Sequence, residues 1–221
     1  MSQPDLKERP ILFSGPMVQA ILDGRKTQTR RVIEDAPNGD GWYFEKNSKN
    51  GSPAFVFRNG LPTMPLPKCP YGQPGDRLWV RETWQGYRMT SYEYDEWEAM
   101  ESPKDRNDDH YSPVYKADGK NFPEKWFPSI FMPREFSRID LLIKDIRVER
   151  LQDISEADAI AEGCRPQFDK SNPVTMNGIQ MMPHISAKED FQRLWDSING
   201  KKHPWESNPW VWVINFERIK L

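Results

Sequence analysis

The chain reads ILDGRKTQTRR from Ile21 to Arg31, and this stretch decides the fold around the candidate site. Apolar residues recur at helical spacing over residues 18–23, and Gly24 then supplies the left-handed conformation that commonly ends a helix. Lys26 and Thr29 therefore begin a new element. Because successive side chains of a strand point to opposite faces, only a turn at a helix-to-strand corner brings these two together. The sequence predicts a pocket at that corner.

Patterned segments alternate with irregular ones along the rest of the chain. Apolar alternation predicts core strands at residues 77–83, 139–151 and 209–216, with a bulge at 144–145 in the second. Helical spacing predicts two further helices at residues 155–162 and 188–198, the first of them capped by Ser155. Irregular stretches near 35–72, 85–127 and 165–185 are predicted as insertions into one domain that covers residues 1–221.

The composition bounds the class of protein. The 221 residues include 9 Trp and 11 Phe, which can bury large areas although only 37% of the residues are hydrophobic. No apolar run approaches the roughly 18 residues that span a bilayer, and residues 1–5 lack a signal-peptide pattern. We therefore expect a cytoplasmic protein with no membrane partner. Cys69 and Cys164 are the only cysteines and lack metal-site spacing, so we expect reduced thiols, no metal and no cofactor.

The charge balance limits the type of ligand. Proteins that grip long nucleic acids usually carry a surplus of Lys and Arg, whereas this chain has a net charge of -2. Its cations cluster between Arg25 and Arg31 instead. This pattern favours a small, anionic ligand in one pocket over an extended RNA track, and a short RNA segment that enters the same pocket remains compatible.

The spacing Gly24-x-Lys26-x-x-Thr29-x-Arg31 resembles the signature of the ASCH domain, a family of PUA-like proteins. The form with Thr at position 29 is similar to the small bacterial N4-acetylcytidine amidohydrolases, which carry a Leu-x-Gly-Arg-Lys-Thr-x-Thr-x-Arg run. Further along, LQDISEADAIAEG at residues 151–163 resembles the family's helix that ends in a catalytic Glu, and Glu162 occupies the matching position.

A resemblance that covers nearly the whole chain is to ASCH-type proteins of bacteriophages and prophages. It is carried by LFSGPM at 12–17, GDRLWVRETW at 75–84, PSIFMPR at 128–134 and PWVWV at 209–213. The resemblance implies a mixed α/β (α+β) fold, built on a small PUA-like β-barrel that helices flank. It also implies Lys26, Thr29 and Glu162 as the catalytic residues.

The chemistry that this resemblance implies is hydrolysis of an acyl amide on a pyrimidine nucleoside similar to N4-acetylcytidine, without a metal. The Lys26 amine, kept partly neutral by nearby arginines, would take the proton of Thr29, and Glu162 would donate a proton to the departing nitrogen. In an alternative assignment Lys26 itself is the nucleophile. Backbone amides of the turn that begins at Gly24, or the side chain of Arg31, would hold the oxyanion.

Six further residues are candidates for substrate binding. They are Arg25, Arg31, Arg81, Glu82, Trp84 and Arg134. Glu82 would pair with Lys26 or Arg31, and Trp84 would stack on a base, as aromatic side chains do with nucleobases. In the alternative interpretation, Glu82 lies on a surface strand and Trp84 packs in the core.

Other functions remain open from the sequence. The protein can be a non-catalytic PUA-like module that binds RNA or a modified base in the same pocket, or a ribonuclease. The basic run can also be a solvated loop, which is the commoner structural role of clustered charges. Finally, His110, His184 and His203 lie in Pro- or Asp-rich segments, and we expect them to be exposed to solvent.

Overall fold

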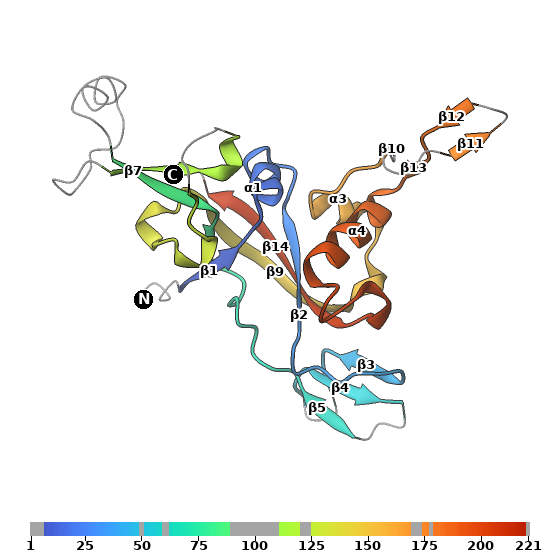
Figure 1. Cartoon of the computed structure of the whole chain (residues 1–221). Helices are drawn as coiled ribbons and strands as arrows, with labels where there is room; N and C mark the ends of the chain where they lie inside the picture. Colours follow the sequence, from blue (N-terminus) through green and yellow to red (C-terminus); the bar gives the residue numbers. More distant parts are fainter. Residues whose placement is uncertain are drawn as a thin grey trace.

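A mixed five-stranded sheet forms the centre of the protein (Figure 1). The computed structural model describes residues 7–48, 51–58, 62–88, 111–119, 125–168, 174–176 and 179–219. In spatial order the strands are β1 (Glu8–Leu12), β6 (Arg77–Arg81), β9 (Asp140–Arg150), β14 (Trp210–Ile219) and β2 (Gln28–Val32). β1 and β6 are parallel, and the other neighbours are antiparallel.

β14 supplies side chains to two hydrophobic clusters on opposite faces of the sheet. Trp212 and Ile214 belong to the cluster that also contains residues of β1, β6 and β9. Val211 and Val213 belong to a second cluster with Phe191. This alternation follows from the two-residue period of a strand, and because both faces are covered the segment 210–214 is apolar throughout.

Three helices in the described part of the chain cover the sheet. α1 (Gly15–Leu22) packs on the first cluster, while α3 (Glu156–Ala161) and α4 (Ala187–Asn199) pack on the second. The three predicted helices are confirmed to within three residues at each end. Ser155 accepts a hydrogen bond from the Asp158 amide and caps α3 as predicted, and Ser186 forms a capping box with Glu189 at the start of α4.

The predicted bulge is also present. Asn215 lies opposite Asp145 and Phe216 lies opposite Ile143, so that Lys144 has no partner residue on β14. The extra residue keeps apolar side chains on the buried face before and after the bulge.

The α+β class is confirmed, but the described strands do not form a closed barrel. β1 and β2 are the two edges of the sheet, and α1 connects them along the chain. Arg31 Nη2 donates to the Leu12 carbonyl oxygen over 2.6 Å. The two edges are thus linked by a side chain and not by backbone hydrogen bonds between paired strands.

The three predicted insertions carry small sheets of their own. Residues 35–72 form β3 (Trp42–Glu45), β4 (Ala54–Phe57) and β5 (Thr63–Pro65). The buried Phe55 ring lies 5.1 Å from the ring of Trp210, which docks this sheet on the core. β7 (Trp84–Arg88) pairs with β8 (Tyr111–Tyr115), and the segment between them lies outside the described residues.

The third insertion extends as a ribbon from the side of α3 and α4 (Figure 1). It pairs β10 (Gln167–Phe168) with β13 (His184–Ile185), and β11 (Val174–Met176) with β12 (Ile179–Met181). The described residues also include short 3-10 turns: η1 (Lys116–Asp118), η2 (Ser129–Phe131), η3 (Arg134–Phe136), η4 (Leu151–Asp153) and η5 (Trp205–Ser207).

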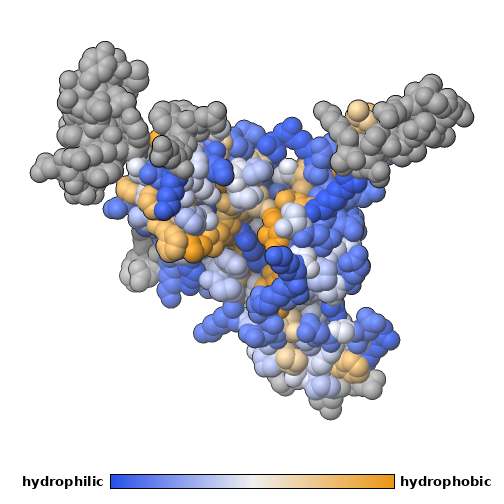
Figure 2. Space-filling view, viewed as in Figure 1, coloured by the Kyte–Doolittle hydropathy of each residue, from blue (hydrophilic) through white to orange (hydrophobic). Residues whose placement is uncertain are grey.

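Apolar side chains gather on the surface on the side of residues 125–136 (Figure 2). Phe127, Ile130 and Phe131 are the exposed large apolar side chains of that segment. Among the helices that the structure describes, none combines the length and the apolar character needed to cross a membrane.

Candidate functional site

The corner between α1 and β2 is fixed by backbone hydrogen bonds. Gly24 has φ +73°, as predicted for the residue that ends the helix. The amides of Arg25 and Lys26 both donate to the Ala20 carbonyl, over 2.8 and 2.9 Å. The Thr27 amide then donates to the Ala161 carbonyl in the last turn of α3 over 2.8 Å. The corner therefore holds Lys26 against the end of α3.

Lys26 and Glu162 form a buried ion pair at this junction. Lys26 Nζ lies 2.7 Å from Glu162 Oε2, and the two side chains are 0% and 3% exposed. The same Nζ donates to the carbonyl oxygens of Gln28 and Glu162, over 2.8 and 2.9 Å, so all three ammonium hydrogens are engaged. Burial lowers the pKa of the Lys26 amine, although the Glu162 carboxylate acts in the opposite direction.

Gly163 lets the two elements approach this closely. It follows Glu162 with φ +96°, a conformation that side-chain-bearing residues rarely adopt. A Cβ at this position would lie 3.1 Å from Ala20 Cβ and 3.4 Å from Lys26 Cβ. The helix ending predicted at Gly163 is therefore also a contact surface for the lysine.

Arg30 supplies a second cation to Glu162. Its Nη1 lies 3.3 Å from Glu162 Oε1, and its Nη2 lies 3.0 Å from Glu149 and 3.3 Å from Asp158. Burial raises the pKa of Asp158, but the hydrogen bond from Gln28 and the charge of Arg30 outweigh burial and lower it to about 2. This buried network fixes the carboxylate of Glu162 from both sides.

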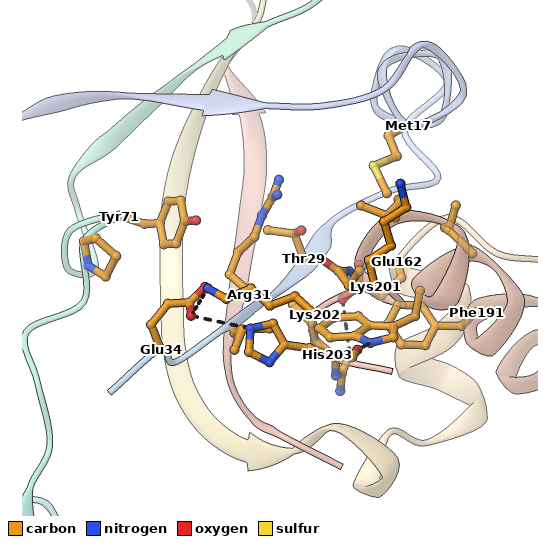
Figure 3. Close-up of a pocket in the computed structure, with 17 residues that line it drawn as sticks. Met17, Thr29, Arg31, Glu34, Tyr71, Glu162, Phe191, Lys201, Lys202 and His203 are labelled. Atoms are coloured by element: carbon orange, nitrogen blue, oxygen red, sulfur yellow. Dashed lines mark hydrogen bonds and ion pairs between the residues drawn. The ribbon is translucent and has the colours of Figure 1, made fainter. Parts of the chain in front are cut away.

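A cavity of about 450 Å³ lies beside β2, and Thr29 and Glu162 both line it (Figure 3). Lys26 lies behind Glu162 and is not part of the lining. The Thr29 hydroxyl forms no hydrogen bond with any residue that the structure describes, so the direct Lys26–Thr29 hydrogen bond that proton transfer would use is not formed. Two members of the predicted trio, Thr29 and Glu162, therefore line one cavity, whereas Lys26 pairs with Glu162 outside the lining.

Arg31 lies between Thr29 and Tyr71 on the cavity wall (Figure 3). Its guanidinium lies 5.2 Å from the Phe13 ring and 5.9 Å from the Tyr71 ring. It pairs with no carboxylate among the described residues, and its buried Nε has no hydrogen-bond partner there. Burial lowers the pKa of Arg31. An unneutralised, partly desolvated cation therefore faces the cavity.

The other end of the cavity contains a second charged group. Lys202 Nζ lies 2.6 Å from Glu34 Oε2, and His203 Nε2 lies 3.4 Å from the same oxygen (Figure 3). The prediction that His203 is exposed is wrong: its side chain is 23% exposed and lines the cavity. Trp195 donates to the His203 carbonyl over 2.8 Å and holds the loop in place. His184 is exposed as predicted, and His110 lies outside the described residues.

Of the six predicted binding residues, only Arg31 lines this cavity. Arg25 pairs with Asp23, and Arg81 stacks over Trp79 at 4.6 Å. Arg134 pairs with two acids, Glu8 and Asp140.

Glu82 and Trp84 follow the structural alternative in part. Glu82 is 1% exposed and pairs with Arg138 at 2.8 Å, so the pairing expected with Lys26 or Arg31 is not formed. Trp84 is buried against the rings of Phe127 and Phe136, at 5.4 and 5.0 Å. Core packing of Trp84 is thus confirmed, and Glu82 is buried instead of lying on the surface.

Several cavity residues were missed by sequence reasoning. They are Tyr71, Phe191, Trp195, Lys201 and Lys202. The helical spacing of residues 188–198 placed Phe191 and Trp195 on the buried face of a helix. This spacing does not show whether such a side chain packs in the core or lines a cavity. Tyr71 lies in an insertion, which carries no periodic pattern.

The cysteines form no disulfide, and burial raises the pKa of the Cys164 thiol to about 12. Within the described ranges, no group of three or more His, Cys, Asp or Glu side chains is placed to hold a metal ion. Comparison of the chain with protein-family models, with curated proteins and with solved structures gives no match.

Proposed function

We propose that this chain is an ASCH-type, PUA-like protein and that its cavity binds a pyrimidine nucleoside whose exocyclic amine carries an acyl group. The corner that places Lys26 against Glu162 supports the resemblance, because two motifs far apart in the sequence meet there. The cavity volume lies within the range of small-molecule sites, and its aromatic side chains suit a base.

One observation carries the enzymatic proposal: an unbonded hydroxyl and an ion-paired carboxylate, Thr29 and Glu162, share a cavity wall. In the proposed reaction Glu162 takes the proton of the Thr29 hydroxyl, and the Thr29 oxygen bonds to the acyl carbon. The bond between that carbon and the exocyclic nitrogen then breaks, and Glu162 returns the proton to the departing amine. Water hydrolyses the acyl ester on Thr29 and releases the acid.

Lys26 has a positioning role in this reaction. Two of its hydrogen bonds fix the ammonium on backbone carbonyl oxygens, and the third orients the Glu162 carboxylate. Its place behind Glu162 keeps it away from the acyl group. This assignment replaces the expectation that Lys26 takes the proton of Thr29 directly or acts as the nucleophile.

Arg31 stabilises the oxyanion. The backbone amides of residues 24–27 already donate to carbonyls of α1 and α3, so they have no free hydrogen for an acyl oxygen. Arg31 lies two residues after Thr29 on the same face of β2, with an unpartnered Nε. Charged donors of this kind stabilise the negative oxygen that forms during acyl transfer.

A non-catalytic reader of RNA or of a modified base is the second candidate. The cations and aromatic rings that line the cavity suffice to bind such a ligand without chemistry.

The test is to incubate the protein with a panel of N4-acylated cytidines and to follow release of the free amine, and to measure binding of short RNAs at several salt concentrations. We expect turnover of the acylated nucleosides. Absence of turnover, together with RNA binding that weakens steeply as salt rises, would favour the reader, because that response reports phosphate contacts.

A further inference from the structure

The two ends of the cavity differ in charge. At the Glu162 end, Lys26 pairs with Glu162, and Arg30 pairs with Glu149, Asp158 and Glu162. The remaining cation there, Arg31, is the one assigned to the oxyanion. At the other end, Lys202 and His203 share a single acid, Glu34.

Lys201 adds a second lysine at this end, and the His203 ring adds a polar atom. Lys201 lines the cavity, and it forms no ion pair with the residues that the structure describes. The His203 Nε2 atom is buried and has no hydrogen-bond partner among the described residues. This end therefore has an excess of positive charge in a chain whose net charge is -2.

The chain sets an upper limit on the distance between the reacting groups and the charge excess. Thr29 and Glu34 are five residues apart, so their Cα atoms are at most about 17 Å apart along the chain. Lys201 and Lys202 line the same cavity as Thr29, and Lys202 pairs with Glu34. A single nucleotide fits within this limit, whereas an RNA segment would need a continuing basic track.

We propose that the ligand of this cavity is a pyrimidine 5′-monophosphate, with its acylated amine at Thr29 and Glu162 and its phosphate at Lys201, Lys202 and His203. This inference rests on the proposed function, because it names the substrate class of the same cavity. A phosphate monoester carries a charge of about -1.5 to -2 at pH 7, which matches the surplus of cations at this end. Lysine binds phosphate as a point charge and does not need a fixed fork geometry.

The experiment measures binding of cytidine and of cytidine 5′-monophosphate by calorimetry, at low and at moderate salt. For the wild-type protein we expect the monophosphate to bind at least about tenfold more tightly, with a preference that shrinks as salt rises. In the double variant Lys201→Ala/Lys202→Ala the preference should fall to near one. Lys144→Ala is the matched control, because this lysine is exposed and pairs with Glu217 at the β9 bulge, and it should keep the full preference.

Hydrolysis assays separate this inference from the proposed function. Equal binding of the two ligands, or equal kcat/KM for N4-acetylcytidine and its 5′-monophosphate, would overturn the phosphate site and leave the amidohydrolase in place. Tight binding of the monophosphate without hydrolysis of either substrate would overturn the amidohydrolase and support the phosphate site. A short RNA with an internal N4-acetylcytidine that reacts faster than the mononucleotide would overturn the proposed substrate class.

Discussion

Lys26 Nζ and Glu162 Oε2 lie 2.7 Å apart, although 136 positions separate the two residues in the sequence. The pair joins the corner after α1 to the end of α3, and both side chains are almost completely buried. A charge that has lost its water is stable only while its partner remains. The pair is therefore both a structural tie and the support of the proposed proton-transfer group.

Replacing Lys26 by Met should destabilise the fold by roughly 3–5 kcal/mol, because it leaves the buried Glu162 carboxylate with only Arg30 as a cation. The double variant Lys26→Met/Glu162→Gln should lose less stability than the sum of the two single variants. Urea denaturation of the four proteins measures this coupling. Strictly additive losses would show that the two side chains do not interact.

The control for this cycle is Lys144→Met. Lys144 pairs with Glu217 at 3.1 Å, but both side chains are more than half exposed. Water screens such a pair, so its loss should cost only about 0–1 kcal/mol.

Asp158 should make stability depend on pH in the acid range. Its pKa in the folded protein is about 2, against an ordinary value of 3.8. A carboxyl group whose pKa is lowered by folding stabilises the fold at pH values above its ordinary pKa. This contribution disappears as the pH falls toward the pKa of the folded protein. Asp158→Asn should therefore lose about 1–2 kcal/mol at neutral pH, and its difference from wild type should shrink between about pH 4 and pH 2. A difference that is constant over this range would contradict the assignment.

Arg31→Met should lower kcat roughly a hundredfold, as removal of an oxyanion donor does in acyl transfer. Its effect on KM should be smaller, because the negative oxygen exists only in the transition state. Steady-state kinetics with an acylated cytidine separate the two parameters, and thermal unfolding checks that loss of the bond to Leu12 has not disrupted the fold. A rise in KM alone would assign Arg31 to binding of the ground state.

Trp84 should matter for stability and not for the reaction. Its ring is buried between Phe127 and Phe136, and it does not line the cavity. Trp84→Ala should cost about 3–5 kcal/mol, while Phe131→Ala, which changes a 64% exposed side chain, should stay within about 0.5 kcal/mol. Altered substrate preference in folded Trp84→Phe would instead place this ring at the ligand.

Local rules predicted much of the secondary structure. Ser155 and Gly163 mark the ends of α3 because capping and positive φ depend on residue type at one position. The bulge at Lys144 was visible as a slip in apolar alternation. Closure of the sheet could not be predicted in this way, because it depends on whether the edge strands β1 and β2 pair with each other. The apolar pattern of a strand does not show which other strand it pairs with.

Only the site residues that belong to a recognised sequence motif could be predicted. Spacing alone does not relate Lys26 to Glu162, and the resemblance supplied that connection. The prediction of ion-pair partners failed most clearly. Glu82 pairs with Arg138, and the positions of these two residues in the sequence do not indicate that they meet. Tyr71 and Lys202 lie in irregular segments, so that no pattern identified them as cavity residues.

The most direct measurement is the rate at which the wild-type protein and the variant Thr29→Val release cytidine from N4-acetylcytidine. Valine keeps the shape of threonine and removes only the hydroxyl that is proposed to attack the acyl carbon. We predict measurable turnover by the wild type and a loss of roughly a hundredfold or more in Thr29→Val, with unchanged circular dichroism. Absence of turnover by the folded wild type, or full activity in Thr29→Val, would contradict the proposed reaction.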